Sequence, residues 1–307
     1  MEQTSIPLGT ADSASAHRTT FYRYWQESRK VRRSAWLLAV YTLLIGGSIL
    51  FVIPLIWMVS TSLRPESEVY TYPPIILPNY FLWNNYVEAW TSILPFTRFL
   101  WNTIFISVGN VVGNLISCAM AAYGFARLRG RGRDLFFALM LATMLLPFEV
   151  TMIPQFILFV RFFDWGNTYL PLMVPAWFGW PFGIFLLRQF IMTIPHELDD
   201  AARIDGASTY RIFWQIMLPL IKPALATVAI FAFVGNWNNF LAPLIYLSEM
   251  EKSTMALALR LFQDQYATYN QHYVMAISVL NVAPILILFF FAQKQFIQGV
   301  ALTGIKG

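Results

Sequence analysis

Few side chains in this chain are suited to catalysis or metal binding, and those few are far apart in the sequence. His17, His196 and His272 lie in different segments, and none has a partner at the spacing of metal ligands. No Ser-His-Asp set converges, because His196 and His272 fall on opposite faces of a membrane in the topology that the basic residues predict. Cys118 is the single cysteine, which excludes an intramolecular disulfide and a CxxC metal site. We therefore expect neither a metal site nor a catalytic centre.

Nucleotide binding by this chain is not supported by the sequence either. A phosphate-binding loop needs the pattern GxxxxGK followed by Ser or Thr, so that backbone N–H groups and a lysine hold the phosphates. The nearest approach runs from Gly299 to Lys306, where Ile305 separates the second glycine from the lysine. We predict that the chain is not an enzyme and binds no cofactor itself.

One acidic side chain lies inside an apolar run, where it could contact a solute. Glu149 stands between Pro147 and Pro154, and a charged side chain at membrane depth costs about 3 kcal/mol or more unless it is paired or hydrated. Two interpretations remain open. Glu149 lines a translocation pathway, or it lies nearer the outer interface or is protonated and bonded to a neighbouring helix.

A second group of polar side chains follows helical spacing further along the chain. Asn236, Asn239, Pro243 and Tyr246 would fall within about an 80° stripe of one helix, because a helix turns 100° per residue. Amides and aromatic rings, with Trp237 nearby, are the groups that bind polyhydroxylated solutes such as sugars. Hydrogen bonding between helices by the same asparagines explains the stripe equally well.

The composition predicts that these residues belong to an integral membrane protein. Hydrophobic residues make up 57% of the 307 residues, charged residues only 12%, and the mean hydropathy is +0.55. Six apolar runs are long enough to cross a hydrocarbon core of about 30 Å as helices. These runs cover residues 36–60, 99–126, 135–160, 169–191, 224–247 and 273–293. All six contain Pro, Gly or polar residues, which is typical of a packed bundle.

The basic residues predict the orientation of these helices. Sixteen of the 21 basic residues fall on one side of the six runs and five on the other. By the positive-inside rule, both termini and the segment near residue 200 are predicted to be cytoplasmic. Because the basic residues are dispersed along membrane edges, the net charge of +5 does not indicate a nucleic-acid partner.

A charged segment from Pro195 to Pro223 interrupts the apolar pattern. Its first part has Glu197, Asp199 and Asp200 after a proline, which suits the positive end of a helix. Gly206 then breaks the helix, and the pattern becomes helical again over residues 207–217 until two prolines close it. The sequence predicts two short helices joined by a turn, lying outside the bilayer.

This segment resembles the EAA loop of permeases from binding-protein-dependent ABC importers, in which EAA is followed after two residues by DGA. The matching positions here are Asp200, Ala201, Ala202, Asp205, Gly206, Ala207, Phe213, Ile216, Leu218, Pro219 and Pro223. Asp200 stands where the family has Glu, which keeps the charge and shortens the side chain.

The resemblance extends over residues 36–307. The loop that begins TSLRPESEVY, the tail QKQFIQGVALTGIKG, and WNNF followed by Pro243 and Leu244 are similar to carbohydrate permeases of the maltose-transporter type. This resemblance implies an all-α membrane protein with the six-helix bundle of a type I ABC importer permease. Residues 1–35 are predicted to be a cytoplasmic tail, residues 36–307 the permease domain, and residues 193–223 its coupling loop.

The resemblance also implies the partner subunits and the substrate class of the chain. It would form half of a sugar pathway in a bacterial or archaeal cytoplasmic membrane, beside a second related permease. Two ATP-binding cassette subunits would supply ATP and Mg²⁺, and an extracytoplasmic solute-binding protein would deliver the carbohydrate. The segment from Glu197 to Ala207 would contact the ATPase, with Ala201, Ala202, Gly206 and Ala207 allowing close approach and Asp205 capping the break.

Two alternatives remain open. A peptide or amino-acid permease of the same class is disfavoured only by the loop and tail resemblance. A secondary transporter is less favoured, because inverted repeats are not evident in the sequence.

Overall fold

The computed structural model describes residues 11–91, 94–266 and 270–304, with side chains described for 32–91, 94–265 and 270–293. Residues 1–10 of the predicted tail and 305–307 of the C-terminal match, which include Lys306, lie outside the described residues. Residues up to Trp57 form one unit and residues from Met58 onward form another. Each unit is described by itself.

The described residues form helices joined by short loops, and no strand occurs among them. The α-helices are α1 (Ala11–Ser62), α2 (Glu66–Val69), α3 (Asn84–Thr91), α4 (Phe96–Arg127), α5 (Arg133–Thr143), α6 (Phe148–Phe156), α7 (Leu170–Met173), α8 (Pro181–Met192), α9 (Glu197–Ile204), α10 (Thr209–Ile212), α11 (Leu218–Leu220), α12 (Lys222–Trp237), α13 (Leu241–Tyr246), α14 (Met255–Tyr266) and α15 (Gln271–Gly304). The π-helical turns are η1 (Ile157–Phe162) and η3 (Phe213–Met217), and the 3-10 turns are η2 (Val174–Phe178) and η4 (Met250–Lys252). The architecture is therefore all-α, as the sequence predicts.

Four stretches are long and apolar enough to cross a membrane, and two bent pairs bring the number to as many as six. The four are Arg32–Ser62, Phe96–Arg127, Leu170–Met192 and Gln271–Gln293. Each coincides closely with one of the predicted runs. The helix α1 passes through the predicted boundary at residues 35 and 36 without a break, so that boundary stays a prediction.

The third predicted run, 135–160, is not one straight helix. Its two parts, Arg133–Thr143 and Phe148–Phe162, are bent by 95°. Pro147 precedes α6 with an extended backbone, and proline disfavours helical conformation in the residue before it. The position of Pro147 therefore explains where the predicted helix breaks.

The second bent pair joins Thr209–Leu220 to Lys222–Trp237 at 76°. The fifth predicted run, 224–247, is interrupted beyond this pair, between α12 and α13. Asn238 caps the end of α12, and the Oδ1 atom of Asn239 accepts a hydrogen bond of 3.3 Å from the backbone N–H of Ala242 in α13. Asparagine competes for backbone hydrogen bonds in this way, so a pair of asparagines ends one helix and begins the next. The prediction of a continuous helix is wrong beyond Trp237.

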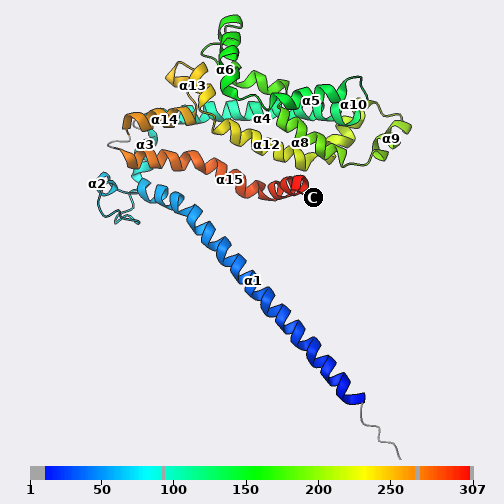
Figure 1. Ribbon diagram of the computed structural model, residues 1–307. Helices are drawn as coiled ribbons and strands as arrows, with labels where there is room; N and C mark the ends of the chain where they lie inside the picture. Colours follow the sequence, from blue (N-terminus) through cyan, green and yellow to red (C-terminus); the bar gives the residue numbers. More distant parts are fainter. Residues whose placement is uncertain (1–10, 92–93, 267–269, 305–307) are drawn as a thin grey trace, which may run out of the picture. The chain divides into compact units, whose positions relative to one another are not determined.

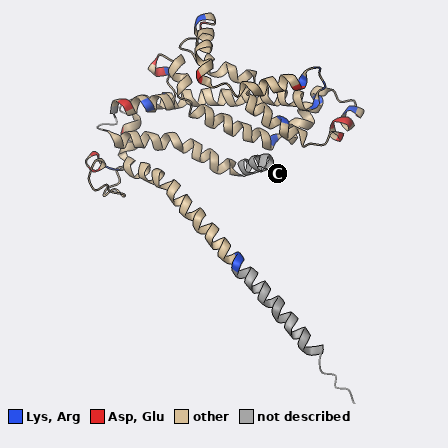
Figure 2. Cartoon of the chain, viewed as in Figure 1, with Lys and Arg blue, Asp and Glu red and all other residues tan. Residues whose placement is uncertain are grey.

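Within the second unit, α4 is the central helix and packs against α8, α12 and η2 (Figure 1). The segment α9–α10 lies at one end of this bundle, and α13 and α14 lie at the other. In Figure 2 most charged residues of this unit lie toward these ends, and α4 carries none between Arg98 and Arg127. This distribution is typical of helices whose middle parts lie in lipid.

The α14 end has its own core of aromatic side chains. Phe96 contacts Phe99 and Phe262 with ring centroids 5.7 and 5.5 Å apart and nearly perpendicular planes, an arrangement in which ring edges face ring faces. All three rings are fully buried. This cluster joins the start of α4 to α14 and α15.

A loop at the same end is tied to the segment that precedes α7. The Nδ2 atom of Asn167 donates to Glu249 Oε1 over 2.6 Å, and Lys252 Nζ lies 3.1 Å from Glu249 Oε2. Lys252 also donates to the carbonyl oxygen of Asn167 over 3.0 Å. The hydrogen bond from Lys252, followed by that from Asn167, lowers the pKa of the Glu249 carboxyl below its usual range.

Candidate functional site: a coupling segment and a polar cavity

The charged segment forms two short helices joined at Gly206, as predicted. The helix α9 ends with hydrogen bonds from the N–H of Gly206 to Arg203 O, 3.0 Å, and from the N–H of Ala207 to Ala202 O, 2.9 Å. This pair of bonds is the Schellman arrangement, which places the residue after the cap in the left-handed region. Gly206 has φ of +79°, a value that glycine adopts without strain.

The next helix, α10, has Ser208 rather than Asp205 as its N-cap. The hydroxyl oxygen of Ser208 accepts a hydrogen bond of 3.3 Å from the N–H of Arg211 and so caps the helix. Asp205 occupies the C-cap of α9, and its side chain is exposed. The prediction that Asp205 caps the break therefore needs correction: Ser208 supplies the cap of the second helix.

The segment has an outer and an inner face. Glu197, Asp200, Ala201, Asp205 and Gly206 are exposed. Ala202 is buried and Ala207 is half-buried, and both pack against the bundle core. Of the predicted small residues, only Ala201 and Gly206 thus remain on the outer face.

Apolar side chains that the sequence analysis did not single out accompany these residues on the outside. Ile204 is 87% exposed and Tyr210 is 77% exposed, one on either side of Gly206, and Leu198 is 43% exposed. Large apolar side chains that stay exposed near a turn are typical of a surface that another protein covers. We call Leu198, Ile204 and Tyr210 the apolar patch.

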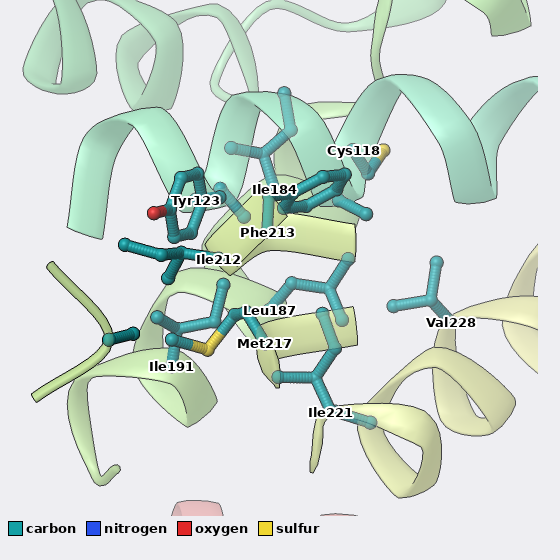
Figure 3. Close-up of a cluster of buried hydrophobic side chains, with 14 residues drawn as sticks. Cys118, Tyr123, Ile184, Leu187, Ile191, Ile212, Phe213, Met217, Ile221 and Val228 are labelled. Carbon is teal, nitrogen blue, oxygen red and sulfur yellow. The ribbon is translucent and has the colours of Figure 1, made fainter. Parts of the chain in front are cut away.

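The inner face joins the segment firmly to the bundle. Ile212, Phe213 and Met217 are buried in one cluster with Tyr123 of α4 and Leu187 of α8 (Figure 3). The ring centroids of Tyr123 and Phe213 lie 5.2 Å apart. The segment is therefore closely packed against both α4 and α8.

A buried ion pair makes a second connection. Arg127, the last residue of α4, has its Nε 3.2 Å from Oδ2 of Asp199 in the first turn of α9. Its Nη2 donates to the carbonyl oxygens of Ile191, 3.0 Å, and Ile194, 2.6 Å, where α8 ends. The sequence marks Asp199 only as one of three acids at a helix start. Neither its burial nor its partner has a signal in the sequence.

A cavity of about 500 Å³ lies between α4, η2 and α12, near the middle of the bundle. Its polar lining consists of four asparagines, Asn110, Asn114, Asn236 and Asn239. Trp180 and Phe231 add aromatic surface. A second, much smaller void shares Asn236 and Asn239 with it.

The wall formed by η2 packs very closely against α4. A Cβ atom at Gly113 would lie 2.8 Å from the ring of Trp177, so any side chain there would force that ring to move. Ser117, one turn further along α4, donates a hydrogen bond of 3.1 Å to the carbonyl oxygen of Ala176. Small residues at such spacing let membrane helices approach each other, and here they fix the position of the cavity wall.

The predicted pathway residues are only partly brought together. Asn236 and Asn239 line the cavity, although they lie at the break of the predicted helix rather than along a stripe, and Pro243 lines the smaller void. Tyr246 is buried and packs against Phe156, with ring centroids 6.2 Å apart, outside both cavities. Glu149 is exposed in the first turn of α6 and lines neither cavity, although Phe148 before it does.

Asn110 and Asn114 are cavity residues that sequence reasoning missed. They lie one turn apart on α4, and their exposed fractions are 2% and 6%. The available signal was a pair of asparagines four residues apart in an apolar run, since such spacing places both on one helix face.

Residues 113–302 match the family model described as the binding-protein-dependent transport system inner membrane component. The arabinooligosaccharides transport system permease protein AraQ of Halalkalibacterium halodurans is 35% identical over 275 residues, or 89% of this chain and 97% of AraQ. The sn-glycerol-3-phosphate transport system permease protein UgpE of Yersinia enterocolitica is 33% identical over 269 residues, or 85% of this chain and 94% of UgpE.

A solved structure shows the same architecture. It is a chain of a bacterial ABC transporter involved in the import of the acidic polysaccharide alginate. The match has a TM-score of 0.73 and 27% sequence identity, and it covers 83% of this chain and 94% of that chain. The similarity therefore includes nearly the whole of each compared protein.

Proposed function

We propose that this chain, which belongs to the family of binding-protein-dependent transport system inner membrane components, is a permease subunit of an ATP-driven importer for a sugar or oligosaccharide. The helix–glycine–helix segment packed into the bundle core is the observation that carries the proposal. It provides a surface for a partner outside and a rigid connection to the membrane helices inside. The names of the similar permeases support the carbohydrate class.

The outer face of the coupling segment is the proposed contact with an ATP-binding cassette subunit. Glu197, Asp200, Ala201, Asp205 and Gly206 would be covered together with the apolar patch. Burying an apolar side chain contributes about 1.5–3 kcal/mol, so a patch of three is a substantial part of a docking interface. ATP and Mg²⁺ would be bound by the cassette subunits, and this chain would not be catalytic.

The coupling step follows from the two connections of the segment. Closure of the ATPases would press on α9, and the Arg127–Asp199 pair and the buried cluster would pass that displacement to α4 and α8. The bundle would then tip between inward-facing and outward-facing states as a rigid body. Because α4 also carries two cavity asparagines, the same movement would reshape the cavity.

The asparagine-lined cavity is the proposed part of the solute pathway, with Asn236 and Asn239 as predicted lining residues. The other half of the pathway would come from a second, related permease, and an external solute-binding protein would deliver the sugar. The α9 end would face the cytoplasm of a multi-pass protein in the cytoplasmic membrane, because basic residues concentrate there.

A non-sugar solute is the second candidate, since similar permeases carry the name of sn-glycerol-3-phosphate. Peptides and amino acids are less favoured, because neither is named by the relatives described above.

The test is reconstitution. The chain should purify as one complex with its partner permease and ATPase subunits, and proteoliposomes containing it should take up a sugar when ATP and the binding protein are supplied. The chain alone should neither bind nor hydrolyse ATP. Tight nucleotide binding by the isolated chain, or a complex that transports no sugar, would contradict the proposal.

A further inference from the structure

The helix α6 and the turn η1 that continues it carry an apolar stripe on their outer side. Neither element has a buried residue, and the exposed positions recur at helical spacing. These positions are Glu149, Val150, Ile153, Pro154, Ile157 and Leu158. Val150 and Ile153 are 64% and 63% exposed. We call the six residues the outer stripe. Because all but Glu149 are apolar, contact of the stripe with water is unfavourable.

The outer stripe begins at membrane depth. The helix α5 starts at Arg133, shortly after Arg127 at the α9 end, and its 11 residues span only about 16 Å. That length is roughly half of a hydrocarbon core of about 30 Å. The chain then bends by 95°, and α6 leaves the side of the bundle (Figure 1). In a membrane that α5 crosses, α6 therefore runs approximately along the membrane plane and starts inside the core.

An environment of lipid tails alone is also unfavourable for the start of α6. Glu149 forms no ion pair or hydrogen bond with the described residues, and a carboxylate that faces lipid is costly. No side chain caps α6, so the N–H groups of Phe148 and Glu149 have no partner in the described part of the chain either. Irregular backbone occurs at membrane depth only where protein or a water-filled cavity covers it. The outer stripe thus combines apolar side chains that disfavour water with polar groups that disfavour lipid, and a protein surface satisfies both.

The neighbouring cavity indicates which protein covers the stripe. Phe148, which precedes Glu149, lines the asparagine-lined cavity, so α6 leaves the bundle directly beside it. Under the proposed function, that cavity is one half of a pathway that a second permease completes. Resting on that function, we infer that the outer stripe packs on the second permease and that the Glu149 carboxylate accepts a hydrogen bond from a donor of that subunit. This places Glu149 in a subunit interface rather than against the solute.

The first experiment is photo-crosslinking in the complete transporter, with p-benzoylphenylalanine in place of Ile153. Leu139 on α5 is the control position, because it is 54% exposed in the same predicted run but lies outside the outer stripe. We expect an adduct with the second permease from position 153 and none from position 139. An adduct only with lipid, with the binding protein or with another copy of this chain overturns the inference, as do equal adducts from both positions. Failure of any second permease to co-purify with the chain counts against the proposed function itself.

The second experiment changes the carboxylate and measures how much second permease co-purifies. Glu149→Leu should reduce that amount at least fivefold, because a donor of the partner loses its acceptor. Glu149→Gln keeps an acceptor oxygen and should stay within twofold of wild type. Contact with lipid predicts the opposite order, since leucine is favourable among lipid tails. Undiminished co-purification of Glu149→Leu therefore overturns the inference.

Co-purification of the ATPase in the same preparations is the internal control. The coupling segment lies at the α9 end, away from α6, so both Glu149 variants should retain the ATPase (Figure 1). Equal loss of the ATPase and the second permease in Glu149→Leu would assign Glu149 to the folding of this chain and overturn the inference.

Discussion

Arg127 and Asp199 join the end of α4 to the first turn of α9 through a buried ion pair, with Nε and Oδ2 3.2 Å apart. The two side chains are only 1% and 4% exposed. The segment proposed to meet an ATPase is thus attached by charge to the helix that carries half of the cavity asparagines. The proposed coupling contact and the proposed solute cavity therefore share one helix, α4.

Removing one partner of this pair should destabilise the protein. Asp199→Asn leaves the Arg127 guanidinium buried without its counterion, a situation that typically costs about 3–5 kcal/mol. We expect a clear decrease of the thermal unfolding midpoint in detergent. Arg131→Gln is the control, because Arg131 is exposed just beyond the same helix end and should leave the midpoint unchanged. An unchanged midpoint in Asp199→Asn would show that the pair is not a structural link.

Replacing both partners separates stability from coupling. Arg127→Met combined with Asp199→Leu removes both charges, and such apolar replacements often restore stability. The double variant should unfold near the wild-type temperature if packing is regained. Should sugar uptake recover with it, α9 needs only a packed connection to α4. Persisting loss of uptake at normal stability would assign the charges themselves to coupling.

Gly206→Val should disconnect the coupling segment without unfolding the bundle. A residue with a side chain pays about 1–2 kcal/mol in the left-handed region, and a β-branched one is the least suited to it. Apart from the two neighbours of Gly206 in the chain, none of the described residues has an atom within 4 Å of a Cβ placed there, so the strain is conformational and any obstruction would fall on the partner. We expect normal membrane insertion, weaker ATPase co-purification and loss of substrate-stimulated uptake.

Two milder substitutions serve as controls for that result. Gly206→Asn should retain most activity, because asparagine tolerates positive φ. Asp200→Glu should be nearly silent, since Asp200 is exposed and its ion pair with Arg203, 3.5 Å, contributes little at the surface. Normal uptake by Gly206→Val at wild-type expression would remove this segment from the coupling mechanism.

The predicted pathway residues should separate into two classes when each is changed to Ala. Asn236 and Asn239 line the cavity, so their variants should lose sugar uptake while the complex still assembles. Tyr246 is buried against Phe156 and Phe159, so Tyr246→Ala should lower stability, whereas Tyr246→Phe should transport normally.

Glu149→Gln should reduce uptake only if its carboxylate faces the pathway in the assembled transporter. Uptake and assembly assays on the same preparations distinguish these outcomes.

The sequence predicted the two short helices and the turn at Gly206 well because their signals are local. Proline and acids at a helix start and a glycine at a helix end act within one or two turns. It predicted the cavity poorly, because Asn110 and Asn236 are 126 positions apart and meet only through the packing of α4 against α12. For the same reason, the sequence does not indicate that Asp199 pairs with Arg127. The two broken helices, by contrast, carried a visible Pro147 and an asparagine pair.

The Glu249 loop should show a pH dependence with a definite sign. Because the hydrogen bonds from Lys252 and Asn167 lower the pKa of the Glu249 carboxyl, they favour the folded loop at pH above the usual carboxyl range. That contribution is lost as the pH falls through the lowered pKa. The thermal midpoint should therefore decrease slightly on acidification, and Glu249→Gln should reduce this dependence. A variant with the wild-type pH profile would contradict this role of Glu249.

The burial of Cys118 has a practical consequence for measuring these movements. Its thiol is fully buried, lies 3.3 Å from the backbone nitrogen of Trp180, and is the only thiol in the chain. Thiol reagents in solution react with accessible thiolates, so the native cysteine should stay silent in the folded protein. A cysteine introduced at exposed Tyr210 would then be the single reactive site. A spectroscopic label could therefore be attached at one chosen position without first replacing Cys118.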